Sequence, residues 1–161
     1  MTNKSKYISL VTNKFLFKLF LIKKFPMGFL AGLNITRLNE EHCTVSMKYS
    51  YLTKNPFQSI YFACLSMGAE LSTGVLAMLS TISHKPSISM LVVNLQSEFT
   101  KKAVGKITFT CNEGKKLADT IKKCTETGEG KTVTIESIAK DETGDIVAKF
   151  CFTWSFKQKK K

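Results

Sequence analysis

The longest apolar stretch of the chain is "NPFQSIYFACLSMGAELSTGVLAML", residues 55–79, and it carries a single charged residue, Glu70. Apolar side chains surround the helix axis almost completely, so no broad polar face remains for solvent. Asn55 precedes a proline, which disfavours helical geometry and indicates a loop before the helix. The pattern predicts a buried helix over residues 58–81 that the rest of the protein wraps.

Much of the remaining chain alternates apolar and polar residues with the two-residue period of β-strands. Leu91, Val93, Leu95 and Phe99 are in step in one such segment, and Ala148, Phe150, Phe152, Trp154 and Phe156 share a face in another. The predicted order is a helix (12–24), two strands (32–39, 42–52), the long helix, two strands (85–102, 105–114), an amphipathic helix (115–130) and two strands (131–141, 145–156).

This order of elements predicts the fold class. An antiparallel sheet can bury a helix along one of its faces. A helix that is apolar almost all round needs a strongly curved sheet, or a partner subunit, to cover it. We therefore predict an α+β hotdog fold, with a curved antiparallel sheet around a long central helix and an extra N-terminal helix. One domain is expected over residues 1–161, with residues 1–11 and 157–161 as flexible ends.

The net charge of 24 − 12 = +12 raises the question of a polyanionic partner. Residues 1–39 hold seven Lys or Arg and no acid, and residues 157–161 hold four lysines. The intervening residues 40–156 contain 13 basic and 12 acidic residues, a balance of only +1. The excess lies at the chain ends and not on a folded basic face, so no nucleic-acid partner is expected.

The cysteines and histidines do not form a metal-binding or disulfide pattern. The chain has five cysteines, an odd number, and no two of them form a CxxC pair. Its two histidines lack the spacing of metal ligands. Cys43, Cys111 and Cys151 lie in alternating segments and are expected to be small core residues. We predict no metal, no resident cofactor, and a reducing, cytoplasmic location.

Two apolar segments could in principle contact a membrane. In residues 60–79 a bilayer span would place Glu70 near the midplane, so a buried helix is favoured. In the 14–24 helix, Lys14 and Lys18 share a face while apolar residues crowd the rest, which leaves peripheral membrane binding as an alternative. Packing of this helix over the domain is the favoured interpretation, and no membrane contact is expected.

The segment "NPFQSIYFACLSMGAE" resembles the start of the central helix in PaaI-like hotdog thioesterases. Their pattern runs from an Asn through a His-Gly-Gly to an acid fifteen residues after the Asn, which falls here on Glu70. The likeness is closer to a branch of that superfamily, domain of unknown function 4442, which has a "GT-x-FGGS-L" version of the segment. Further stretches, "FPMGFLAGLNI" and "SMLVVNLQSEFTKKAVG", also resemble this branch, so the likeness covers most of the chain.

The resemblance implies a role for each site residue. Glu70 would be the general base or nucleophile toward a thioester, facing the helix start of a second subunit. The backbone N–H of Phe62 or Ala63 would polarise the carbonyl oxygen. Asn55 would orient water or substrate. Side chains expected to contribute further hydrogen bonds are those of Tyr61, Ser87 and Ser89.

Each of these residues also has a structural interpretation. Glu70 could be an acid held by a neighbouring Ser or Thr, although burying an ionised carboxylate without a partner is costly. Asn55 could be an ordinary turn residue, and Ser87 and Ser89 plain strand residues. The chain also departs from the thioesterase pattern, because Tyr61-Phe62-Ala63 replaces His-Gly-Gly, and the Phe62 side chain can crowd the place where glycine lets substrate approach.

The expected function is hydrolysis of an acyl thioester, acyl-coenzyme A or an acyl-carrier thioester, with coenzyme A entering only as part of the substrate. The expected assembly is a homodimer or a dimer of dimers. Lys101, Lys102 and Lys106 are candidates to contact the coenzyme phosphates, or form a solvated edge. The alternative function is a non-catalytic hotdog protein that binds acyl-coenzyme A or acyl lipids.

Overall fold

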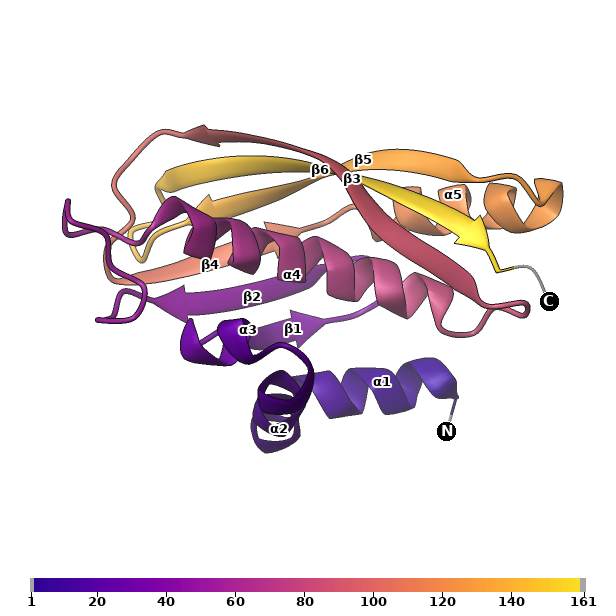
Figure 1. Cartoon of the computed structure of the whole chain (residues 1–161), viewed down its shortest axis with the longest axis horizontal. Coiled ribbons are helices and arrows are strands. Elements are labelled where there is room, and N and C mark those ends of the chain that lie inside the picture. The colour runs from indigo at the N-terminus through magenta and orange to yellow at the C-terminus, as the bar shows by residue number, and fades with distance from the viewer. Residues whose placement is uncertain (1, 160–161) are drawn as a thin grey trace.

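Helix α4 (Phe62–Thr81) runs along the inner face of a curved six-stranded antiparallel sheet (Figure 1). The computed structural model describes residues 2–159. The strands are β1 (Asn34–Leu38), β2 (Cys43–Lys48), β3 (Ile88–Phe99), β4 (Lys106–Cys111), β5 (Lys131–Lys140) and β6 (Ile146–Gln158). Their spatial order is β1-β2-β4-β5-β6-β3, which leaves β1 and β3 at the two edges. This is the predicted hotdog fold.

Helix α4 is buried because its side chains fill the curve of the sheet. Thirteen of its twenty residues are buried, and it packs against β2, β4 and β5. Gly68 allows the close approach to β4, since a Cβ at this position would lie 2.5 Å from the ring of Phe109. A helix of this length and composition could cross a bilayer, but here it is the core helix of the domain.

The polar residues of α4 connect the helix to the sheet. The hydroxyls of Ser72 and Ser137, both fully buried, lie 2.7 Å apart, and Trp154 Nε1 donates to Thr73 Oγ1 at 3.2 Å. Hydrogen bonds of this kind stabilise a fold by about 1 kcal/mol each, and losing one partner costs more because the other is left buried. These contacts explain why Ser and Thr are tolerated in an otherwise apolar helix.

The boundaries of α4 differ from the prediction at one end. The helix begins at Phe62 and not at residue 58. Residues 58–61 instead bend back along neighbouring backbone: Gln58 has φ +58°, Ile60 N–H donates to the carbonyl of Ala103, and Tyr61 N–H donates to that of Thr53. These contacts between segments that are distant in sequence outweigh the local apolar pattern. Tyr61 therefore becomes the residue that caps the helix.

Three N-terminal helices lie beside β1, below α4 in Figure 1: α1 (Asn3–Thr12), α2 (Lys14–Lys24) and α3 (Pro26–Leu30). The prediction of a single helix over 12–24, after a flexible end, was wrong for residues 3–12. Thr2 and Asn13 accept hydrogen bonds from the first turns of α1 and α2, and so act as N-caps. Pro26 begins α3 where the prediction used it only to mark the end of a helix.

The predictions for the C-terminal half are confirmed for the buried face of β6 and for α5, but not for Cys151 or the end of the chain. The face of β6 that carries Phe150, Phe152, Trp154 and Phe156 is buried, as predicted, and Cys151 on the opposite face is half-buried instead of a core residue. Helix α5 (Gly114–Thr127) packs on α4 and β5 and ends at Gly128. Strand β6 continues through Gln158, so residues 157–158 are not a flexible end, while residues 160–161 lie outside the described range.

Strand β3 differs most from a core strand. The side chains that the sequence places in step are exposed: Leu91 65%, Val93 52%, Leu95 41% and Phe99 45%. The strand is an edge strand and, among the described residues, pairs only with β6, so its outer backbone edge is uncovered and these side chains are only partly covered. A long, apolar, unpaired edge is a template for pairing with another chain.

Candidate active site

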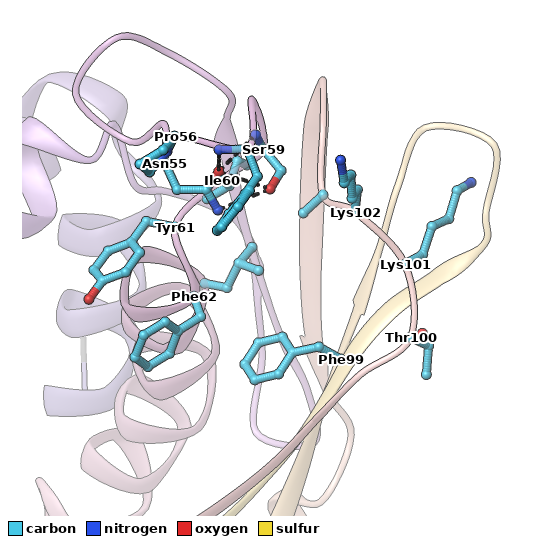
Figure 2. A pocket seen from close by; sticks show the side chains of 13 residues that line it. Asn55, Pro56, Ser59, Ile60, Tyr61, Phe62, Phe99, Thr100, Lys101 and Lys102 are labelled. Atoms are coloured by element: carbon cyan, nitrogen blue, oxygen red, sulfur yellow. Dashed lines mark hydrogen bonds between the residues drawn. The ribbon is translucent and has the colours of Figure 1, made fainter.

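The start of α4 forms one wall of a cleft of about 630 Å³ (Figure 2). The other walls are the loop of residues 55–60 and the segment of residues 99–103 that leaves β3. Phe62 stands at the mouth, 54% exposed, with its ring edge-on to those of Tyr61 and Phe99 at centroid distances of 4.8 and 6.2 Å. The cleft is therefore apolar at its base and open to solvent.

The backbone at this end of α4 is available to a substrate. Tyr61 accepts hydrogen bonds from the N–H groups of Cys64 and Leu65, but within residues 2–159 the N–H groups of Phe62 and Ala63 have no acceptor. Unpaired amides in the first turn carry the partial positive charge of the helix dipole. They are suited to stabilise negative charge that develops on a carbonyl oxygen.

Asn55 is held by its own loop. Its Oδ1 accepts hydrogen bonds from the N–H groups of Phe57 (2.9 Å) and Ser59 (3.2 Å), and its Nδ2 donates to Ser59 Oγ at 3.0 Å. Figure 2 shows this network above the start of the helix. The side chain shapes the loop that walls the cleft, as the structural interpretation of this residue implies, and one N–H of its amide remains for a substrate.

Glu70 lies in a second opening, of about 360 Å³, on the side of α4 that faces β3. Phe62 and Ala63 line its near end, and Leu95 and Phe152 its far wall. Gly74, one turn further along α4, leaves room for the carboxylate, because a Cβ there would lie 2.9 Å from Glu70 Oε1. Among the described side chains that line this opening, those with a nitrogen or oxygen atom are Glu70 and its neighbour Ser66.

The carboxylate of Glu70 accepts no hydrogen bond and makes no salt bridge within residues 2–159. Burial among apolar groups therefore raises the pKa of Glu70 above its ordinary value of 4.5. This result does not support the interpretation of Glu70 as an acid held by a nearby Ser or Thr. A raised pKa brings a carboxyl closer to the range in which it can exchange protons with a substrate.

A single chain does not bring all the predicted residues together. Glu70 follows Phe62 by eight residues, or about 12 Å along the helix. Ser87 precedes β3, and Ser89 at its start donates to the carbonyl of Lys157. Leu95, which borders the Glu70 opening, follows Ser89 by six residues, or about 20 Å along the strand. Asn55, Tyr61 and Phe62 share the first cleft, whereas Ala63 lines the Glu70 opening, which Phe62 also borders.

The three lysines that could contact the coenzyme phosphates have different surroundings. Lys101 is neutralised by Asp141 (2.6 Å) and Asp145 (2.7 Å) from the β5–β6 turn. These hydrogen bonds lower the pKa of both aspartates, and they identify Lys101 as a residue that fixes the turn. Lys106 lies in a different hollow, between β1, β2 and the start of α2. Lys102 lines the cleft, as Lys101 does, but it makes no salt bridge within the described residues.

Sequence reasoning missed the contribution of β3 and Phe99 to the site. Phe99 closes the cleft and Leu95 borders Glu70, yet both were predicted only as members of an alternating strand. The signal that could have indicated this role is the apolar character of both faces of the segment 90–95, which is more than one sheet face requires.

The fold, a curved antiparallel sheet around a long central helix, defines the hotdog class. The domain family described as Domain of unknown function (DUF4442) matches residues 13–156, and the chain belongs to it. No curated protein sequence matches this chain.

Solved structures show the same fold at low sequence identity. A Pseudomonas aeruginosa protein described as a probable thioesterase is 18% identical, with a TM-score of 0.77 over 93% of this chain and 99% of that one. A Chlorobaculum tepidum protein of unknown function is 13% identical, with a TM-score of 0.74 over 94% and 99%. A Haemophilus influenzae thioesterase is 11% identical, with a TM-score of 0.62 over 87% and 88%.

Phe62 provides a direct test of access to the cleft. Replacing Phe62 with glycine is expected to raise kcat/KM for bulky acyl thioesters several-fold and to change that for short ones little, because the ring narrows the mouth next to the free amides. Stability should change little, since the side chain is half exposed and lies in the first helical turn. Tyr61→Gly, which removes a neighbouring ring outside the helix, is the control. Equal gains in kcat/KM for Phe62→Gly and Tyr61→Gly would contradict the assignment of the Phe62 ring as the group that narrows the mouth of the cleft.

Proposed function

We propose that the protein is a hydrolase of acyl thioesters, acting on acyl-coenzyme A or an acyl-carrier thioester as a homodimer in the cytoplasm. The observation that carries the proposal is Glu70: a carboxylate without a partner among residues 2–159, with a raised pKa, in an apolar opening that adjoins the free amides of α4. The thioesterase-like fold agrees with it. The five free cysteines fit a reducing compartment.

The proposed reaction uses groups of this chain only. The carboxylate of Glu70 accepts a proton from water, and the resulting hydroxide attacks the carbonyl carbon of the thioester. The N–H groups of Phe62 and Ala63, from the other subunit, stabilise the oxyanion. When the intermediate collapses, the C–S bond breaks and the proton held by Glu70 passes to the thiolate. Direct attack by Glu70, through an anhydride, is the other route.

The homodimer is required because Glu70 and the first turn of its own helix are too far apart to act on one carbonyl. The exposed edge of β3 supports such pairing, and Leu95 on that strand borders the Glu70 opening. A second subunit along β3 would enlarge the sheet and enclose the acid. A dimer of dimers would need an additional face.

Lys102 is the residue we propose for the phosphates of coenzyme A. It lines the same cleft as Phe62, whose N–H is one of the two free amides, and its charge is not neutralised by a neighbour in the described structure. Lys101 is held by its two aspartates and is less suited to this role. No metal or other cofactor enters the proposed reaction.

A panel of acyl-coenzyme A thioesters, with free thiol as the readout, tests the activity. Turnover is expected for at least one acyl class, and it should be weaker for the same acyl group on a short thiol without phosphates. Comparison with a Glu70 variant separates the protein's own activity from that of contaminants. Absence of turnover throughout the panel would overturn the proposal.

The alternative, an acyl-binding protein without activity, is favoured by one observation, the ring of Phe62 at the position where a glycine is expected. In that case acyl-coenzyme A should protect the protein against thermal unfolding without release of thiol. The same panel, followed by thermal shift in parallel, distinguishes the two functions.

A further inference from the structure

Helix α2 has apolar side chains on two opposite faces. Phe17 and Leu21 are buried, each 1% exposed, and attach the helix to the domain. Phe15, Leu19 and Ile22 are 70%, 41% and 49% exposed. At about 100° per residue these three fall within about 60° of one another, on the side away from Phe17 and Leu21. We call Phe15, Leu19 and Ile22 the outer stripe.

Lysines border the outer stripe on both sides. By the same geometry Lys18 lies beyond one margin of the stripe and Lys23 beyond the other, and both are exposed. Neither lysine makes a salt bridge within residues 2–159. No acid occurs in residues 1–39, so this charge is not compensated by nearby sequence.

We propose that α2 binds the surface of an anionic lipid bilayer. The outer stripe would enter the boundary between headgroups and acyl chains, while Lys18 and Lys23 would contact the anionic headgroups. An apolar stripe between rows of lysine is the pattern of interfacial helices, whose affinity rises with buried apolar area and with anionic lipid content. This inference departs from the sequence-based expectation that packing over the domain accounts for the helix.

Charge complementarity selects lipid over a second copy of the chain. Two copies meeting through their outer stripes would bring lysines against lysines with no acid between them, which is unfavourable. A bilayer rich in anionic headgroups provides both the apolar layer and the opposite charge. The proposal does not depend on hydrolysis, because α2 contributes no residue to the Glu70 opening or to the cleft at the start of α4.

Flotation of the full-length protein with vesicles tests the proposal. Vesicles of phosphatidylcholine with about one-third phosphatidylglycerol should carry the protein upward, whereas pure phosphatidylcholine should carry much less. Added salt should reduce the anionic binding, because it screens the lysines. Protein that remains with the unbound fraction at low salt would overturn the proposal, and so would equal binding to both kinds of vesicle.

Two variants test the stripe and the lysines separately. Phe15→Ser with Leu19→Ser, and independently Lys18→Glu with Lys23→Glu, should each reduce partitioning about tenfold or more. The matched apolar control is Tyr51→Ser with Leu52→Ser, at positions 80% and 62% exposed, and it should float like the parent. The matched charge control is Lys115→Glu with Lys123→Glu on α5.

All substituted side chains in these variants are exposed, so the thermal midpoint should change little and loss of binding would not reflect unfolding. Unchanged flotation of the serine pair would overturn the proposal. A larger assembly in light scattering that the serine pair dissolves, with no vesicle binding by the parent, would show a second copy as the occupant and would also overturn it.

A fluorescent residue at Phe15 gives a readout that depends on insertion. Trp154, the one native tryptophan, is 4% exposed and lies in the core. In Phe15→Trp the new indole should be quenched when part of the lipid carries bromine on its acyl chains, while the parent emission should stay constant. Equal insensitivity of parent and variant would contradict insertion of the outer stripe.

Discussion

Glu70→Gln is expected to reduce thioester turnover by about a hundredfold or more, because the variant keeps the shape of the side chain and loses its ability to accept a proton or attack. The proposed homodimer should remain intact. The measurement is release of free thiol from the best substrate of the panel, with the oligomeric state followed by light scattering. The control is Glu126→Gln on α5, which removes an exposed acid from a face that lines neither cleft.

The pH dependence of the parent should report the same carboxyl. Burial raises the pKa of Glu70 above 4.5, so the unfolded chain ionises at lower pH than the folded one. The stability that the neutral acid provides is complete below the unfolded pKa and is lost as the pH rises through the folded pKa. The thermal midpoint of Glu70→Gln should therefore equal that of the parent in acid and exceed it at neutral pH.

Low pH, which favours stability by keeping Glu70 neutral, should reduce turnover, because the base must be ionised. Turnover should fall as the pH is lowered through the raised pKa of Glu70. Undiminished hydrolysis by Glu70→Gln would exclude Glu70 as base or nucleophile. Unfolding of the variant would instead show that the acid has a structural partner, contrary to its unpartnered state in the structure.

Leu91→Glu together with Val93→Glu should convert the proposed homodimer to a monomer and abolish turnover. Both side chains are exposed on the edge strand β3, so the fold of the single chain should survive. Two carboxylates facing the same two in a second copy would repel across the paired edges. The measurements are light scattering at micromolar concentration and thiol release.

The matched control places two acids on the other edge of the sheet, as Thr36→Glu with Arg37→Glu on β1. This variant should stay dimeric and active. If the β3 variant became monomeric and remained fully active, the shared site would be wrong, and so would the argument that Glu70 is too far from the amides of its own helix. A parent that is monomeric at micromolar concentration would exclude the assembly outright.

Local sequence patterns were sufficient to predict the type of the core elements and, in places, their ends. The two-residue period of residues 145–156 corresponds to the buried face of β6, and Gly128 ends α5 as its position predicts. The apolar run that contains Glu70 identified the central helix, because the run is longer than a strand buried on both faces. The isolation of one acid in that run, together with its fifteen-residue offset from Asn55, selected the candidate carboxylate.

Tertiary contacts decided the features that local patterns do not contain. Residues 58–61 could have continued α4, but hydrogen bonds to Thr53 and Ala103 hold them as loop, and this places the free amides at Phe62 and Ala63. Lys101 and Lys102 are adjacent in sequence, yet only Lys101 meets the aspartates of the β5–β6 turn. The apolar period of β3 predicts a strand but not its place, and only the strand order shows that its apolar side chains are exposed at an edge. Burial is a property of the assembled sheet, because it depends on which residues from other parts of the chain cover each face.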